Sequence, residues 1–229
     1  MKPLSILFIV LTLALLGFST YQALVVAPTE ATMGPVQRIF YYHVPSAWVA
    51  GLCFFVNFLA SVAYLVSRGS KADALAAASA EVGVVFCTIV LITGPIWARP
   101  VWGIWWTWDA RLTTTLVLWL IYVSYLILRR FAAGSQTQVL SAVLSVFGFL
   151  DVPIVYMSIR WFRTQHPSPV IGGGEGSGLD PTMWHAVLWN WLAFSCLALL
   201  LVMVRYRLQR MEETVEAAHA QLALQGGSR

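Results

Sequence analysis

The stretch MWHAVLWNWLAFSCLALLLVMV, residues 183–204, contains no Asp, Glu, Lys or Arg and is followed by RYRLQR, residues 205–210. A helix needs about 20 mostly apolar residues to cross the hydrocarbon core of a bilayer. Unpaired backbone polar groups are not tolerated in lipid, and the stretch shows no strand-like alternation. It therefore predicts a membrane-spanning helix with a basic end.

Five more apolar runs repeat this pattern. They cover residues 3–26, 44–66, 74–98, 112–128 and 139–156, the last extending toward Trp161. The composition agrees, because 59% of the 229 residues are hydrophobic and only 10% are charged, against roughly 25% charged residues in soluble domains. We therefore predict an all-α, polytopic integral membrane protein. Six transmembrane helices occupy residues 1–208, and residues 209–229 form a short cytoplasmic tail that is partly helical.

The distribution of basic residues predicts the orientation of the helices. The larger set lies at one group of helix ends: Lys2, Arg68, Lys71, Arg129, Arg130, Arg205, Arg207, Arg210 and Arg229. The smaller set lies at the opposite ends: Arg38, Arg99, Arg111, Arg160 and Arg163. Because cytoplasmic loops are enriched in Lys and Arg, we expect both termini in the cytoplasm. Segments 27–43, 97–111 and 161–182 are then the outer loops.

Several classes of function do not fit the sequence. The net charge of +4 does not indicate nucleic-acid binding, because the basic residues are thinly spread between apolar runs. Cys53, Cys87 and Cys196 lie inside apolar runs without CxxC spacing, so they predict neither a thiol redox centre nor a zinc site. We expect the first run to be an uncleaved helix, because it is longer than a usual signal-peptide core and lacks a clean cleavage site.

The second outer segment is unusually rich in tryptophan. It reads RPVWGIWWTWDAR, residues 99–111. An aromatic belt at the membrane interface explains some of these residues, but not their density or the adjacent Gly103 and Asp109. Indole rings form a broad, flat, apolar surface with a few N–H donors, and a glycine lets a ligand approach the backbone. We therefore interpret the segment as a platform for a planar ligand rather than as a belt alone.

Two histidines lie in the other two outer segments. His43 ends the first segment, in YYHVP, and His166 lies in the third, in RTQHP. Imidazole is the commonest axial ligand of haem iron. Two imidazoles from separate loops are able to bind the two faces of one haem that lies on the tryptophan platform. His185, at the start of the sixth predicted span on the same side, is a rival ligand that no physical argument excludes.

Charged residues add two further expectations. The outer arginines either pair with nearby acids or hold haem propionates, which suit a bidentate guanidinium. Glu81 and Asp151 lie inside predicted spans, where ionisable groups are costly and usually face a partner helix. For these two acids we favour structural polar contacts over an ion path. We expect Pro153 to kink the fifth span.

These residues together resemble a known motif. The pattern WGxxWxWD, formed by Trp102, Gly103, Trp106, Trp108 and Asp109, is similar to the signature of the WWD haem-handling protein family. The YHVP sequence before the second span, a histidine after the fifth, the chain length and the six-helix count resemble the CcmC branch of that family, which acts in cytochrome c maturation. The resemblance covers about residues 35–205.

The resemblance implies roles for the candidate residues. Axial ligands in that family come from the first and third outer loops, which correspond here to His43 and His166, with His185 as the alternative. The tryptophan-rich loop forms the haem platform: Trp102, Gly103, Trp106, Trp108 and Asp109, followed by Arg111. This geometry would hold haem and leave one edge open for transfer.

The resemblance also implies a cellular role. Family members hold haem b at the periplasmic face of the bacterial inner membrane and present it to the haem chaperone CcmE. They work with the ABC subunits CcmA and CcmB and the small membrane subunit CcmD. The chain has no Walker phosphate-binding loop, so we expect a non-catalytic component, in contact with membrane lipid, whose partners hydrolyse ATP.

Two other functions compete with this interpretation. An electron-transfer haem protein of the cytochrome b type usually places its ligands within the spans on facing helices, but no histidine lies deep in a predicted span. A small-solute permease that uses Glu81 and Asp151 would transport its substrate and bind no haem. The visible absorption spectrum of the purified protein distinguishes these functions.

Overall fold

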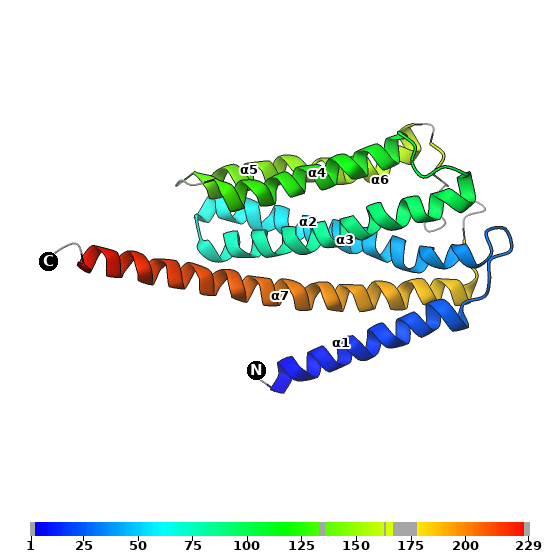
Figure 1. The fold of residues 1–229 in the computed structure, drawn as a ribbon, viewed down its shortest axis with the longest axis horizontal. Helices are drawn as coiled ribbons and strands as arrows, with labels where there is room; N and C mark the ends of the chain where they lie inside the picture. The colour runs from blue at the N-terminus through cyan, green and yellow to red at the C-terminus, as the bar shows by residue number, and fades with distance from the viewer. Residues whose placement is uncertain (1–2, 133–135, 163, 167–177, 227–229) are drawn as a thin grey trace.

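A computed structural model describes residues 3–132, 136–162, 164–166 and 178–226. Its elements in chain order are α1 (Pro3–Tyr21), the π-helix η1 (Gln22–Val26), the 3-10 helix η2 (Pro35–Ile39), α2 (Phe40–Ser67), α3 (Ser70–Trp102), α4 (Ala110–Phe131), α5 (Thr137–Phe149), α6 (Asp151–Trp161) and α7 (Pro181–Gly226). Within the described ranges there is no β-strand, and 6 helical segments are long and apolar enough to cross a membrane. The predicted all-α, six-span architecture is therefore confirmed (Figure 1).

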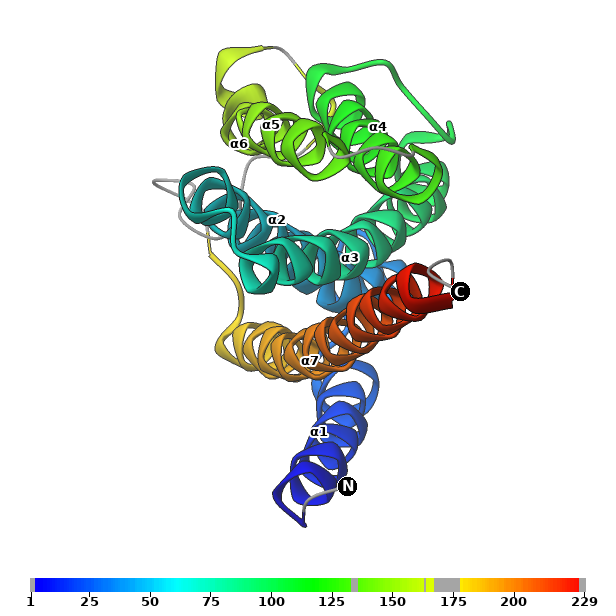
Figure 2. The same ribbon diagram turned by 90° about the vertical axis from the view of Figure 1, so that its left-hand side faces the viewer.

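Helices α2 and α3 form the centre of the bundle. They pack against each other more extensively than any other pair of elements. Helices α4, α5 and α6 cover one side of this pair, α7 covers the other, and α1 lies outermost against α7 (Figures 1 and 2). The start of α1 and the end of α7 lie toward the same end of the bundle (Figure 1), as an even number of spans requires.

Close packing of α2 on α3 depends on a glycine. The Phe54 ring of α2 stacks on Tyr122 of α4, with ring centroids 3.8 Å apart and ring planes 12° from parallel. A Cβ atom at Gly83 of α3 would lie 2.6 Å from Cε1 of Phe54. Small residues commonly allow membrane helices to approach closely, and Gly83 does so here.

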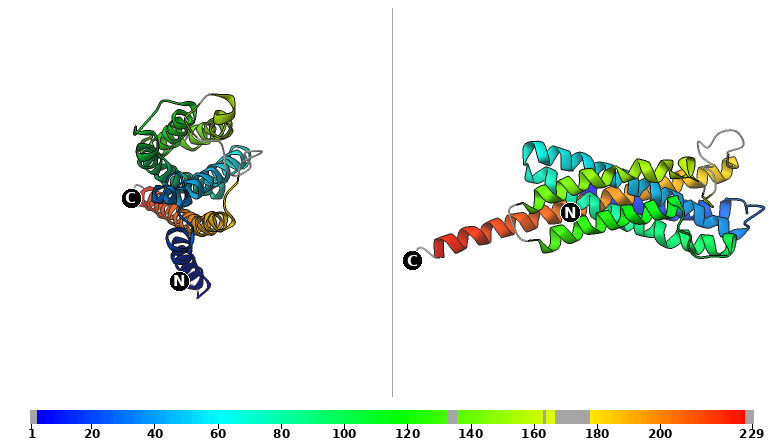
Figure 3. Two further views of the ribbon diagram at one scale, coloured as in Figure 1. Left: turned by 90° about the vertical axis from the view of Figure 1, so that its right-hand side faces the viewer. Right: turned by 90° about the horizontal axis from the view of Figure 1, so that it is seen from above.

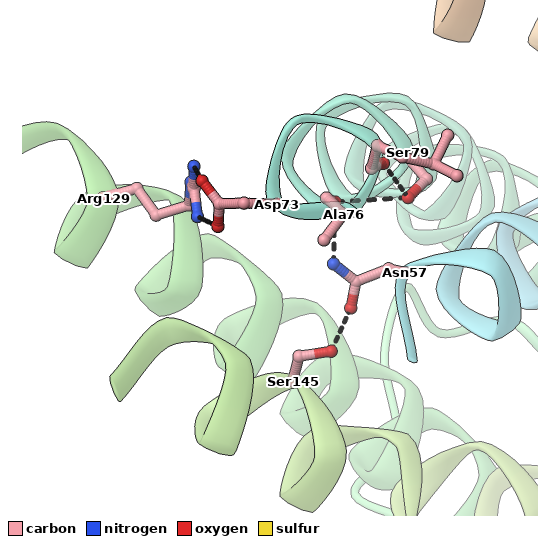
Figure 4. A network of polar contacts seen from close by, with 7 residues as sticks. Asn57, Asp73, Ala76, Ser79, Arg129 and Ser145 are labelled. Carbon is pink, nitrogen blue, oxygen red and sulfur yellow. Dashed lines mark hydrogen bonds and ion pairs between the residues drawn. The ribbon is translucent and has the colours of Figure 1, made fainter. Parts of the chain in front are cut away.

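Buried polar side chains join the helices near the end at which α3 begins (Figure 4). Arg129 of α4 donates two hydrogen bonds to the Asp73 carboxylate of α3, at 2.6 and 2.8 Å. Asn57 of α2 donates to the Ala76 carbonyl at 2.8 Å and accepts a hydrogen bond from the Ser145 hydroxyl. Partnered polar groups in an apolar interior favour one packing arrangement over others.

Glu81 takes part in an ion pair between two spans. Arg205 of α7 donates two hydrogen bonds to the Glu81 carboxylate of α3, one of them at 2.9 Å. The pair joins α3 to α7, and the structural role that we expected for Glu81 is confirmed.

The fifth span is broken between α5 and α6. Pro153 has no N–H, so the Phe149 carbonyl lacks its usual helical donor. At the junction, the Leu150 N–H bonds to the Phe147 carbonyl three residues earlier, at 3.1 Å, rather than four residues earlier as in an α-helix. The regular helix is thus interrupted at Leu150, three residues before Pro153, where we expected a kink. Asp151 opens α6, and its Oδ2 atom is buried without a hydrogen-bond partner among the described residues. The polar contact that we expected for that oxygen is not seen there.

The observed helix ends differ from the predicted ones by a few residues, and the differences that affect the candidate site lie at one end of the bundle. Helix α2 begins at Phe40 and so includes His43, which we had placed in a loop. Helix α3 continues to Trp102, and α4 already includes Arg111, so the loop predicted at 97–111 is much shorter. The apolar pattern marks only the hydrocarbon depth, whereas backbone hydrogen bonds continue each helix past that depth.

Helix α7 is a single helix of 46 residues. At about 1.5 Å per residue it is roughly 69 Å long, more than twice the roughly 30 Å hydrocarbon core. The sequence has neither Gly nor Pro between Pro181 and Gly226, so nothing interrupts the helix. The helix expected in the tail is therefore a continuation of the sixth span, and it extends beyond the other helices (Figure 3).

Candidate functional site

The candidate residues lie at one end of the bundle, opposite the chain termini. Helices α3 and α6 end there, and α2, α4 and α7 begin there (Figures 1 and 3). Because consecutive spans alternate in direction, residues far apart in the sequence are brought to the same end.

His43 lies in the first turn of α2 and contacts α3. Its Nδ1 atom is 2.8 Å from Oγ1 of Thr93. Its ring meets the Trp97 ring edge-on, with centroids 5.9 Å apart and planes at 72°. His43 is also close enough to His166 and Arg111 to interact with them electrostatically. The structure thus brings two of the predicted ligands and one predicted arginine into one region.

The tryptophan-rich segment begins with a sharp turn at Gly103. Trp102 is the last residue of α3, and Gly103 follows it with φ +79°, a left-handed conformation that favours glycine. The Gly103 N–H donates to the Arg99 carbonyl at 3.0 Å, and the Arg99 guanidinium donates to the Gly103 carbonyl. Glycine is therefore required here by the backbone conformation that ends α3.

The indoles after this turn are largely exposed. The Trp105 and Trp108 side chains are 59% and 76% exposed. Trp106 packs edge-on against Trp108, with ring centroids 5.7 Å apart and planes at 78°. The Trp106 indole N–H is buried and has no acceptor among the described residues. The exposed aromatic faces of Trp105 and Trp108 form a surface suited to a flat, apolar ligand.

Asp109 connects the tryptophan segment to the segment that carries His166. Its Oδ1 atom accepts a hydrogen bond from the Leu112 N–H at 3.0 Å, which caps α4. Its Oδ2 atom accepts from the Thr107 hydroxyl at 3.3 Å and from the Thr164 hydroxyl at 2.9 Å. Oγ1 of Thr164 in turn accepts from the His166 N–H at 3.0 Å. Asp109 therefore fixes the position of the His166 backbone.

Arg111 lies in the first turn of α4, within electrostatic reach of His43. One guanidinium nitrogen donates to the Tyr156 carbonyl of α6 at 3.3 Å. The Nε atom is buried and has no partner among the described residues. A half-buried cation with an unused donor favours an anionic group nearby.

The other outer arginines bind parts of the chain itself. Arg38 donates to the Ala23 carbonyl at 3.0 Å, which belongs to η1. Arg160 lies over the Tyr156 ring, 4.7 Å from its centroid. Arg163 lies outside the described residues. Among the arginines in the described ranges, Arg111 is thus the best placed to meet a ligand carboxylate.

His185, the rival ligand, lies in the first turn of α7. Its side chain is exposed, and the hydrogen bonds described above do not link it to the tryptophan segment. His166 is linked to that segment through Thr164 and Asp109. This geometry favours His166 over His185.

Sequence reasoning did not identify Thr93 and Trp97. They lie four residues apart and so share one face of α3, and both contact His43. A threonine and a tryptophan at helical spacing, two residues before Arg99, are a weak local signal. Only the packing of α2 on α3 shows that they surround a histidine.

The fold and the site define a class of protein: a six-span membrane protein with histidines and an exposed tryptophan surface at one end. Within this class, the chain belongs to the Heme exporter protein C family, CcmC, whose sequence profile matches residues 1–221. The predicted family is confirmed, and the match is wider than the motifs that indicated it.

Bacterial relatives match most of the chain. Heme exporter protein C of Bradyrhizobium diazoefficiens is 35% identical over 208 residues, which cover 90% of this chain and 78% of that protein. The Haemophilus influenzae protein of the same name is 34% identical over 214 residues, covering 92% and 86%. The Escherichia coli K12 protein is 34% identical over 188 residues, covering 79% and 73%.

Proposed function

We propose that this chain holds haem at the end of the bundle where α2 begins, with His43 and His166 as axial ligands of the iron. The observation that supports this proposal is that both histidines lie at the same end of the bundle within electrostatic reach of each other, one on α2 and one held to the tryptophan segment by Thr164 and Asp109. Two imidazole ligands fill both axial positions of haem iron and leave no open position for oxygen.

The chemistry of the surrounding residues fits haem. The exposed Trp105 and Trp108 faces suit the apolar macrocycle, and the half-buried Arg111 guanidinium suits a propionate. All three cysteines lie within spans rather than in the connecting segments. No thiol of the chain is therefore placed to form a thioether with a vinyl group, and we assign the cargo as haem b.

The proposed location follows from the charge distribution. The chain termini and the more basic ends of the spans lie opposite the candidate site, and the positive-inside rule supports a cytoplasmic location of the termini. The site then faces the periplasm of a bacterial inner membrane. There the chain presents haem to the chaperone CcmE, and CcmA, CcmB and CcmD act with it. ATP hydrolysis belongs to the ABC subunits, and the contribution of this chain is to position haem.

A haem titration of the purified protein in lipid nanodiscs tests this proposal. Wild-type protein is expected to bind haem with a sharp Soret band. His43→Ala and His166→Ala should each weaken binding strongly and shift that band. His185→Ala is the matched control, and it should bind haem as the wild type does. A wild-type spectrum in His166→Ala, with loss of the band in His185→Ala, would replace His166 by its rival.

A further inference from the structure

The hydrogen bonds around Thr93 indicate which nitrogen of His43 carries a proton. Oγ1 of Thr93 is 2.7 Å from the Ile89 carbonyl one turn earlier on α3, and 2.8 Å from Nδ1 of His43. A carbonyl oxygen only accepts, so the single hydroxyl proton of Thr93 is donated to Ile89. Thr93 is then free to accept from His43, which favours the tautomer with the imidazole proton on Nδ1.

The other ring nitrogen is consequently left with its lone pair. Metal-ligating histidines are commonly oriented by a hydrogen bond from the nitrogen that does not bind the metal. We propose that Thr93 is a positioning residue that holds His43 in the Nδ1–H tautomer, so that Nε2 binds the haem iron. This inference rests on the proposed function and adds a residue to it.

Two neighbours of Thr93 keep the ring in place. Gly94 brings the α3 backbone close, since a Cβ atom there would lie 3.6 Å from Cε1 of His43. Trp97, one turn later, meets the ring edge-on. Because α2 and α3 form the most extensive helix pair of the molecule, the imidazole orientation is set by the rigid centre of the bundle.

The group that accepts the hydrogen bond from Nδ1 of His43 affects how tightly His43 binds the iron. This strength matters for a protein that must release haem. A carboxylate acceptor raises the basicity of a ligating imidazole and strengthens the bond to the metal. A hydroxyl is neutral and polarises the imidazole less. Thr93 therefore orients His43 while leaving a ligand that a receiving protein is able to displace.

Removal of the hydroxyl tests this role in the full-length protein in nanodiscs. Thr93→Val keeps the shape and removes the acceptor, and it should lower haem affinity by about tenfold, the lower end of the effect seen for second-shell partners of metal ligands. The low-spin electron paramagnetic resonance signal of the ferric haem should also shift, because it reports imidazole orientation. Thr93→Ser restores the hydroxyl and should return both readouts to wild type.

A matched control is present on the same helix. The Thr88 hydroxyl likewise donates to a carbonyl one turn earlier, that of Val84, but accepts from the Trp119 indole at 2.8 Å and does not touch His43. Thr88→Val should leave haem affinity and the resonance signal unchanged. If Thr93→Val fails to fold, Thr93→Ala removes the same acceptor with less steric demand.

The outcomes separate this inference from the proposed function. Wild-type affinity and signal in Thr93→Val or Thr93→Ala, together with loss of haem in His43→Ala, would overturn the role of Thr93 and leave the ligand assignment standing. Unchanged haem binding in His43→Ala would overturn both. Equal losses of haem affinity in Thr93→Val and Thr88→Val would show that Thr93 contributes only to packing, and would overturn the inference.

Discussion

The carboxylate of Asp109 accepts hydrogen bonds from one backbone amide and two hydroxyl groups. These bonds occupy both oxygens, so the residue acts mainly on the chain around it. It caps α4 and, through Thr164, fixes the segment of His166. The sequence motif placed Asp109 among the haem-contacting residues; its bonds instead favour a supporting role behind the proposed ligand.

Substitutions at Asp109 and Thr164 separate these two effects. Asp109→Ala removes the helix cap and the bond to Thr164, so it should lower the free energy of unfolding by about 1 kcal/mol and also weaken haem binding. Thr164→Val removes only the link to His166. It should lower haem affinity several-fold, up to about tenfold, with little change in thermal stability. Thermal unfolding and haem titration in the same detergent measure both quantities, and wild-type affinity in Thr164→Val would contradict the proposed link.

The position of Arg111 leads to a prediction about how the haem propionates contribute to binding. Wild-type protein should bind haem more tightly than haem dimethyl ester, because the ester has no charged group for the guanidinium. Arg111→Gln should abolish most of this preference, while Arg160→Gln should keep it, since Arg160 lies over Tyr156. Titration with both haem compounds gives the comparison. Equal preference in wild type and Arg111→Gln would assign the propionates to another residue.

At the scale of helices, the α2 and α3 pair positions the site. His43 belongs to one helix and its neighbours Thr93 and Trp97 to the other. Hydrophobicity predicted both spans because the preference of each run for lipid is a local property. It did not predict Thr93 or Trp97, because their role depends on which helices pack together and in which register.

The packing of α2 on α3 predicts that an alanine substitution affects stability differently at two glycines. A Cβ at Gly83 would lie 2.6 and 2.8 Å from ring atoms of Phe54, and Phe54 is itself stacked on Tyr122. Gly83→Ala should therefore destabilise the protein by about 1–3 kcal/mol through overpacking. A Cβ at Gly51 of α2 meets nothing within 4 Å, so Gly51→Ala should be neutral or stabilising by up to about 1 kcal/mol.

Thermal unfolding in one detergent compares the two variants with wild type. A lower melting temperature only for Gly83→Ala supports the close approach of α2 and α3. Equal melting temperatures for both variants would show that Phe54 moves aside without cost.

The whole molecule has two different ends. One end brings together His43, His166 and the tryptophan segment, and at the other α7 continues past the remaining helices. The six spans and an irregularity near Pro153 followed from sequence alone, because apolar runs and proline act locally. The helical positions of His43 and Arg111 did not, because the prediction followed the apolar runs rather than helix-end signals such as Gly103 after α3 and Asp109 before α4. The choice between His166 and His185 rested on family resemblance until the link through Asp109 was seen.

The central claim is that one iron is bound by imidazoles from two separate parts of the chain. Electron paramagnetic resonance of the ferric, haem-loaded protein tests it most directly. The wild type should give the low-spin signal of a six-coordinate haem with two imidazoles. His43→Ala and His166→Ala should each replace it with a high-spin, five-coordinate signal. A low-spin signal that survives either substitution unchanged would contradict the claim.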